Sequence, residues 1–163
     1  RGREERQAGG ELWRRASAWL RPGGAFAPIA LPDGTLAAVG EELRADVMRV
    51  AGAARVLSAG VPLAVERGRK AVPHAALATS LALAPDAFPC VELDTPEAVA
   101  FLRRETLQLP PEAPRGYVVV TYDGLPLGFL NNLGSRANNL YPAEWRIRSS
   151  HVAETPHVVL TDA

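Results

Sequence analysis

The chain has 163 residues, enough for one ordinary domain or two small ones with a real hydrophobic core. Hydrophobic residues make up 47% of it and charged residues 22%, which excludes a chain that is disordered throughout, a collagen-like chain and a disulfide-stapled scaffold. The 18 basic and 18 acidic residues cancel, so a surface for nucleic acid or membrane has to arise from local segregation of charge.

Residues 1–22 predict an amphipathic helix, because Trp13, Ala16, Trp19 and Leu20 recur at helical spacing. This apolar stripe would be exposed if the helix stood alone. We therefore expect it to pack on this chain or on an upstream domain, with a partner-binding helix as the alternative.

Residues 25–39 predict two strands joined by a turn at Pro32-Asp33-Gly34. A helix is expected to open at Gly40-Glu41-Glu42-Leu43 and to bury the stripe Leu43, Val47 and Val50. A second strand pair is expected at 55–58 and 61–65, followed by a basic turn at 67–70 and a helix over 75–83.

Asp94-Thr95-Pro96-Glu97 has the cap, proline and acid that begin a helix, which we expect to end near Glu105. The clearest hairpin joins strands at 116–122 and 125–130 through Asp123-Gly124, with Pro126 making the second strand an edge or bulged one. A short last strand is expected at 145–148, with Trp145 turned into the core.

The single cysteine, Cys90, excludes an internal disulfide and a thiolate zinc cluster, which favours a reducing cytoplasm. Its apolar neighbours predict a small buried core residue. No stretch approaches the roughly 20 apolar residues of a membrane span, and no signal peptide is recognisable. We expect a cytoplasmic protein with no membrane partner and no metal site.

All four asparagines lie between positions 131 and 139, as Asn131, Asn132, Asn138 and Asn139. Asparagine supports left-handed turns, and its amide also presents a donor and an acceptor to bases or ribose hydroxyls. The cluster therefore fits either turn chemistry alone or an RNA-reading loop.

Residues 131–148 also carry a net positive charge, because they contain three arginines, Arg136, Arg146 and Arg148, and one acidic residue, Glu144. Guanidinium groups suit phosphates, and the nearby Tyr141 could stack on a base. A nucleic-acid surface and a merely solvated strand face both fit this pattern.

Four consecutive stretches carry a family resemblance: Gly116 to Phe129, Asn131-Asn-Leu-Gly, Arg136-Ala-Asn-Asn-Leu-Tyr-Pro and Glu144-Trp-Arg-Ile-Arg. Together they resemble the C-terminal PUA-like RNA-binding domain of RsmF-type rRNA cytosine-C5 methyltransferases, which belong to the Nol/Nop/Sun family. Stretches at 56–63 and 73–78, and the expected helix that follows Leu93-Asp94 and includes residues 101–105, resemble the linking domain of those enzymes. The resemblance covers about residues 20–150.

The resemblance implies an α+β chain of two small domains, the second a PUA-like mixed β-barrel with a flanking helix. The implied boundaries are a helical segment or linker at 1–22, the linking domain at 23–89, the RNA-binding domain at 90–150 and a tail at 151–163. The implied function is substrate recognition for a methyltransferase of ribosomal RNA, most simply that of the small subunit. The expected RNA-binding residues are Lys70, Asn131, Asn132, Arg136, Asn138, Asn139, Tyr141, Arg146 and Arg148.

The family's catalytic domain binds S-adenosylmethionine and attacks cytosine with a cysteine. Here Pro89-Cys90 lacks the surrounding motif and no Gly-rich loop precedes it, so we expect neither a catalytic residue nor a cofactor in this chain. His74 is expected to cap or pack a helix. The resemblance implies that the partner of this chain is an N-terminal methyltransferase domain. The first residue is Arg1 rather than Met, which fits either a piece of a longer chain or a start that is not included.

Two other hypotheses stay open. The chain could chiefly brace the methyltransferase core, with little RNA affinity of its own, or it could be a free-standing RNA-binding module.

Overall fold

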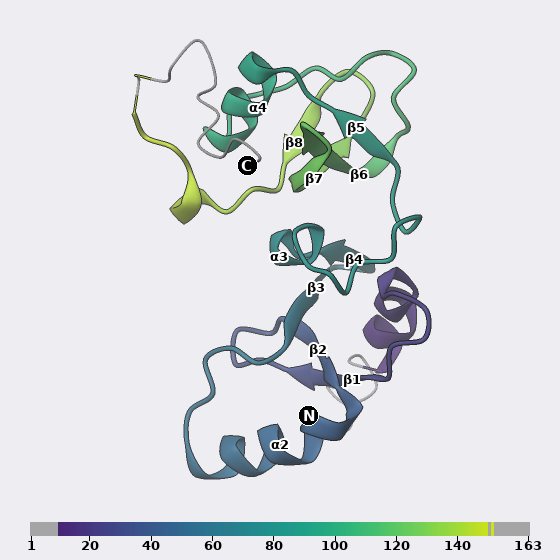
Figure 1. Cartoon of the computed structure of the whole chain (residues 1–163), viewed down its shortest axis with the longest axis vertical. Coiled ribbons are helices and arrows are strands. Elements are labelled where there is room, and N and C mark those ends of the chain that lie inside the picture. Colours follow the sequence, from purple (N-terminus) through teal and green to yellow (C-terminus); the bar gives the residue numbers. More distant parts are fainter. Residues whose placement is uncertain (1–9, 150, 152–163) are drawn as a thin grey trace, which may run out of the picture. The chain divides into compact units, whose positions relative to one another are not determined.

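The computed structural model describes residues 10–149 and 151. The chain divides between Pro89 and Cys90 into two compact units, called here the N-terminal and the C-terminal unit (Figure 1). Each unit has helices and a four-stranded sheet, so the predicted α+β class is confirmed.

The sheet of the N-terminal unit is antiparallel, in the order β1-β2-β3-β4. Its strands are β1 (Phe26–Ala30), β2 (Leu36–Gly40), β3 (Val61–Arg67) and β4 (Lys70–Pro73). The predicted β1–β2 hairpin and its turn are confirmed, and Asp33 supports the turn by accepting a hydrogen bond from the Thr35 N–H at 2.9 Å. That bond, with the Thr35 hydroxyl, lowers the pKa of the Asp33 carboxyl.

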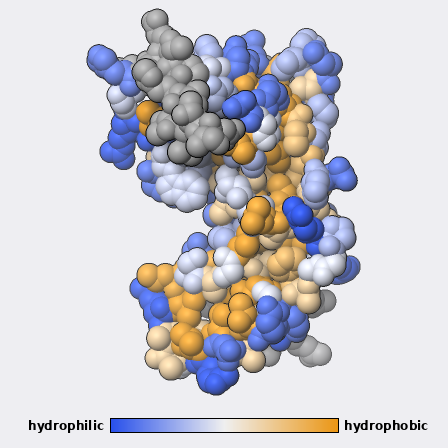
Figure 2. Space-filling model, in the orientation of Figure 1, coloured by the Kyte–Doolittle hydropathy of each residue, from blue (hydrophilic) through white to orange (hydrophobic). Residues whose placement is uncertain are grey.

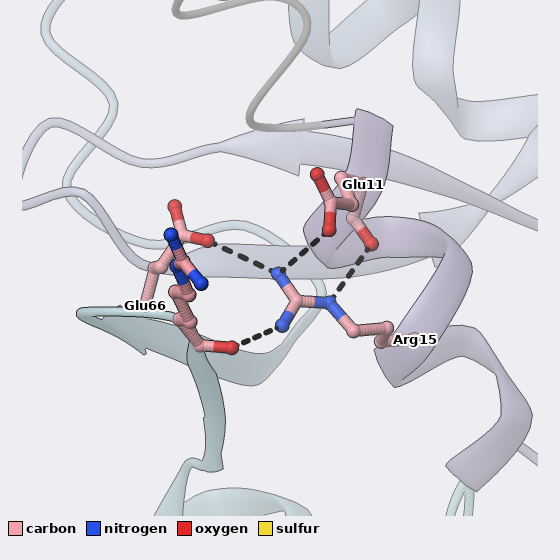
Figure 3. Close-up of polar contacts among 4 residues, drawn as sticks. Glu11, Arg15 and Glu66 are labelled. Atoms are coloured by element: carbon pink, nitrogen blue, oxygen red, sulfur yellow. Dashed lines mark hydrogen bonds and ion pairs between the residues drawn. The ribbon is translucent and has the colours of Figure 1, made fainter.

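Residues 10–16 are helical and continue into a 3-10 turn, η1 (Ser17–Trp19). Leu12, Ala16 and Leu20 are buried, so the helix packs on its own unit. Arg15 ties it to the β3–β4 hairpin, reaching Glu66 at 3.1 Å and the Arg69 carbonyl (Figure 3). The expectation that this stripe packs against the chain is confirmed for Ala16 and Leu20, whereas Trp13 and Trp19 are half-buried. Residues 1–9 of the predicted helix lie outside the described residues.

The predicted strand at 55–58 is wrong, because β3 instead pairs with β2 and with β4. Gly60 directly precedes β3, which starts at Val61 as predicted. It has a φ of +64°, and a Cβ there would lie 2.2 Å from the Ala38 carbonyl oxygen. The chain therefore crosses against β2 at Gly60 before strand pairing begins.

The helix predicted over 75–83 is only one turn, α3 (Ala75–Ala78). His74 Nδ1 accepts a hydrogen bond from the Ala76 N–H at 3.2 Å, which confirms its capping role. The Ser80 hydroxyl accepts from the Ala82 N–H at 3.1 Å, and this local turn replaces a continued helix.

The helix expected after Gly40 forms as η2 (Glu41–Leu43) and α2 (Arg44–Ala53), but its predicted buried stripe is wrong. Leu43 is 53% exposed and Val50 54%, and only Val47 packs on the core of β1 and β2. Figure 2 shows apolar side chains gathered over this part of the unit.

The sheet of the C-terminal unit has the order β5-β6-β7-β8, with β5 parallel to β6 and the other pairs antiparallel. The elements are β5 (Cys90–Glu92), α4 (Thr95–Leu102), β6 (Gly116–Tyr122), β7 (Leu125–Asn132), β8 (Ala137–Asn139) and the 3-10 turn η3 (Ala143–Trp145). The described strands form an open mixed sheet with α4 beside it, rather than a closed barrel.

Local signals place these elements. Asp94 and Glu97 form a reciprocal capping box at the start of α4, which ends at Leu102. The predicted hairpin is confirmed, and its register shifts at Val120/Thr121, opposite Pro126. Phe101 on α4 is fully buried in a core with residues of β6 and β7.

Two interpretations of this unit are wrong. Cys90 is exposed rather than buried, because it lies on the outer strand β5. Residues 145–148 form no strand: Pro142 leads into η3, and the chain then runs beside the end of α4, where the Ile147 N–H donates to the Leu102 carbonyl at 3.0 Å. Trp145 is 52% exposed rather than in the core.

No helix among residues 10–149 is long and apolar enough to cross a membrane.

Candidate nucleic-acid interface

One row of side chains crosses three neighbouring strands on a single face of the C-terminal sheet. Tyr117 of β6 pairs with Asn131 of β7, which pairs with Asn138 of β8. Directly paired residues share a face, so a phenol and two amides stand side by side. Asn138 is exposed and the other two are half-buried, and burial raises the pKa of the Tyr117 phenol. This row offers hydrogen-bonding groups at the surface.

The other two asparagines are used within the domain. Asn132 is 4% exposed; its Nδ2 donates to the Ala113 and Pro114 carbonyls at 3.1 and 3.0 Å, and its Oδ1 accepts from the Gly134 N–H at 2.9 Å. Asn139 donates to the Phe101 carbonyl at 2.8 Å and accepts from the Tyr141 N–H at 2.8 Å. The sequence left open whether the asparagines support turns or bind RNA, and in the structure Asn132 and Asn139 make hydrogen bonds that support turns and packing.

Arg136 lies at the turn between β7 and β8, where its carbonyl accepts from the Leu133 N–H at 2.9 Å. Sequence reasoning missed its neighbour Arg115, which precedes β6 at the same end of the sheet. The Arg115 guanidinium lies over Gly134, where a Cβ would come within 3.0 Å of its Nη2. Two exposed arginines thus mark this end of the sheet.

Three aromatic rings lead from the core to the surface. Phe101 and Tyr141 have centroids 5.4 Å apart and Tyr141 and Trp145 6.0 Å, both edge-to-face. Tyr141 is half-buried between the other two, so the ring open to solvent is that of Trp145. The sequence pattern pointed to Tyr141 for stacking and missed Trp145, because it placed that tryptophan in the core.

Arg146 and Arg148 line an open pocket of about 420 Å³ beside the end of α4. The Arg103 guanidinium, which sequence reasoning also missed, lines it too and holds one wall by donating to the Ser149 carbonyl at 2.7 Å. The remaining lining is Glu105, Ile147 and Ser149. Because Arg103 is 43 positions before Arg146, no local sequence pattern could have joined them.

Within residues 10–149, none of these three arginines forms an ion pair with a carboxylate; the pairs found there lie in the N-terminal unit. Three guanidinium groups and one carboxylate line the open pocket, and this excess of positive charge favours an anion, above all a phosphate.

Lys70 begins β4 in the N-terminal unit, whereas the other expected RNA-binding residues lie in the C-terminal unit. Among the residues that the structure describes, no three His, Cys, Asp or Glu side chains are grouped as a metal ion would require.

Residues 88–147 match the family model of the methyltransferase RsmF PUA domain. The match confirms the resemblance for the C-terminal part of the chain and includes every expected RNA-binding residue except Lys70 and Arg148. A comparison with curated proteins found no match.

Proposed function

Because the C-terminal unit carries an RsmF-type PUA domain, an RNA-binding accessory part of a methyltransferase, we propose that the chain is the substrate-recognition region of an S-adenosylmethionine-dependent rRNA (cytosine-C5) methyltransferase. The observation that carries this proposal is a group of arginines in the C-terminal unit, Arg103, Arg146 and Arg148, that line an open pocket and form no ion pair within residues 10–149. Small-subunit ribosomal RNA in the cytoplasm is the proposed substrate.

In this proposal Arg136, Arg146 and Arg148 neutralise phosphates of folded RNA, as Lys70 does from the other unit. Asn131 and Asn138 offer amides to bases or ribose. Asn132, Asn139 and Tyr141 contribute by shaping the loops that present these groups.

Catalysis would belong to the upstream domain, which would also bind S-adenosylmethionine; this sequence has no Gly-rich loop to cradle the cofactor. Holding the RNA beside that domain raises the effective concentration of the target cytosine.

The test is fluorescence anisotropy of the chain with a folded small-subunit rRNA segment across a salt series. Arg136→Ala and Arg146→Ala should each weaken binding and lower the log–log salt slope by up to about 0.9, as loss of one phosphate contact does. Arg14→Ala, an exposed arginine of the N-terminal helix, is the charge-matched control and should change neither. Absence of salt-sensitive binding by the wild type would refute the proposal.

One observation favours the bracing function as a second candidate. Leu43, Val47 and Val50 of the N-terminal unit line an apolar pocket of about 470 Å³ against β2 and the segment before β3. Such a surface suits contact with another protein domain. If bracing is the main function, Leu43→Ser with Val50→Ser should lower the melting temperature of the complete enzyme while leaving the RNA affinity of this chain unchanged.

A further inference from the structure

We infer that Trp145 and the pocket lined by Arg146, the next residue in the chain, form a site for one unpaired RNA nucleotide, with the base on the indole and its phosphate among Arg103, Arg146 and Arg148. This inference rests on the proposed RNA-binding function and assigns it a substrate class, RNA that is single-stranded at the point of contact.

The pocket has the charge that a phosphate needs. Three guanidinium groups and one carboxylate line it, and within residues 10–149 none of the three is neutralised by an ion pair. Arg103 donates one N–H to the Ser149 carbonyl, which fixes its side chain and leaves its other donors for a ligand. The site is thus partly preorganised for an anion.

The exposed indole of Trp145 has the surface that a base needs. Trp145 directly precedes Arg146 and is 52% exposed. Its contact with Tyr141 is edge-to-face, with ring planes at 73°, so it uses at most one face of the indole. Tyr141 is in turn supported by the fully buried Phe101, which makes the tryptophan the outer end of an anchored aromatic row.

An aromatic ring can stack only on a base that has left the helix, whereas phosphates are presented by paired and unpaired RNA alike. The pairing of an exposed indole with a phosphate pocket therefore favours an unpaired nucleotide over a duplex backbone.

The test compares two labelled probes, a short oligouridylate and a blunt-ended RNA duplex, by anisotropy with the whole chain. Trp145→Ala should weaken oligouridylate binding about fivefold or more, the lower end of what one stacked base contributes, and leave duplex binding unchanged. Trp145→Phe should retain most of the affinity. Arg148→Gln should lower the salt slope for the oligouridylate by about 0.7, and Arg14→Gln should not.

Circular dichroism of each variant checks folding. If Trp145→Ala is misfolded, the nucleotide site is tested with the Arg148→Gln and Trp145→Phe variants instead. Unchanged oligouridylate affinity in folded Trp145→Ala, alongside salt-sensitive binding of rRNA by the wild type, would overturn the nucleotide site and leave the proposed function standing. Failure of the wild type to bind any RNA would overturn both.

Discussion

Asn132 and Asn138 are the same residue type six positions apart, yet the structure gives them opposite environments. Asn132 is buried and makes three hydrogen bonds, whereas Asn138 is exposed on β8. Replacing Asn132 removes three part-buried hydrogen bonds, and one such bond contributes about 0.5–1.5 kcal/mol.

Asn132→Ala should therefore lower the free energy of unfolding by about 2 kcal/mol, measured by denaturant titration. Asn138→Ala is the matched control; its stability should stay within about 0.5 kcal/mol of wild type. Equal stability losses in the two variants would show that the loop does not depend on the Asn132 amide.

Glu92 links β5 to the β6–β7 turn. Its carboxylate accepts from the Thr121 hydroxyl and from the Gly124 N–H at 3.3 Å, and these bonds, the hydroxyl first, lower its pKa from 4.5. The folded state thus binds fewer protons than the unfolded state near this pH.

The stability that Glu92 contributes is present above about pH 4.5 and is lost as the pH falls through the folded pKa. Thermal melts at neutral pH and at progressively lower pH should show the wild type losing more of its stability than Glu92→Gln. A parallel decline in both proteins would contradict the assignment.

The connection that leads into β3 requires a glycine at position 60. Its positive φ and the close Ala38 carbonyl leave no room for a side chain. Gly60→Ala should destabilise the chain by about 2 kcal/mol or more, from strain and displacement of β2.

The matched control is Gly52→Ala, since Gly52 lies in α2 with open space where a Cβ would stand. That change should raise stability by about 0.5 kcal/mol because alanine favours a helix. Chemical denaturation of both variants measures the contrast, and a tolerated alanine at Gly60 would refute the close approach.

In the whole molecule, the two units have cores of their own, one around β1 and β2 and one around α4, β6 and β7. Leu63 and Leu130 are fully buried leucines, one in each unit. Leucine-to-alanine changes at such sites cost about 2–5 kcal/mol.

Leu130→Ala should speed amide hydrogen exchange in β6, β7 and β8 and leave β1 to β4 unchanged, while Leu63→Ala should do the reverse. Mass spectrometry of peptides from each unit gives the readout. Faster exchange in both units from either change would mean that they unfold as one cooperative body.

The sequence by itself determined the features that depend on neighbouring residues. The capping box at Asp94, the Asp123-Gly124 hairpin and the turn at Pro32-Asp33-Gly34 were predictable because caps and tight turns involve only a few consecutive side chains and backbone groups. The RsmF-type PUA resemblance was also readable, since it lies in a contiguous run matched over residues 88–147.

Which apolar side chains are covered, and which distant charges meet, depends on contacts between segments far apart in the sequence. Val50 and Trp145 are apolar residues that the sequence placed in a buried position, yet both are exposed, because burial depends on which other segment covers a side chain. Arg103 joins Arg146 and Arg148 because the chain after η3 returns to the end of α4, held there by backbone bonding between Ile147 and Leu102. A long-range return of this kind leaves no periodicity in the sequence, and the arginine pocket of the candidate site depends on it.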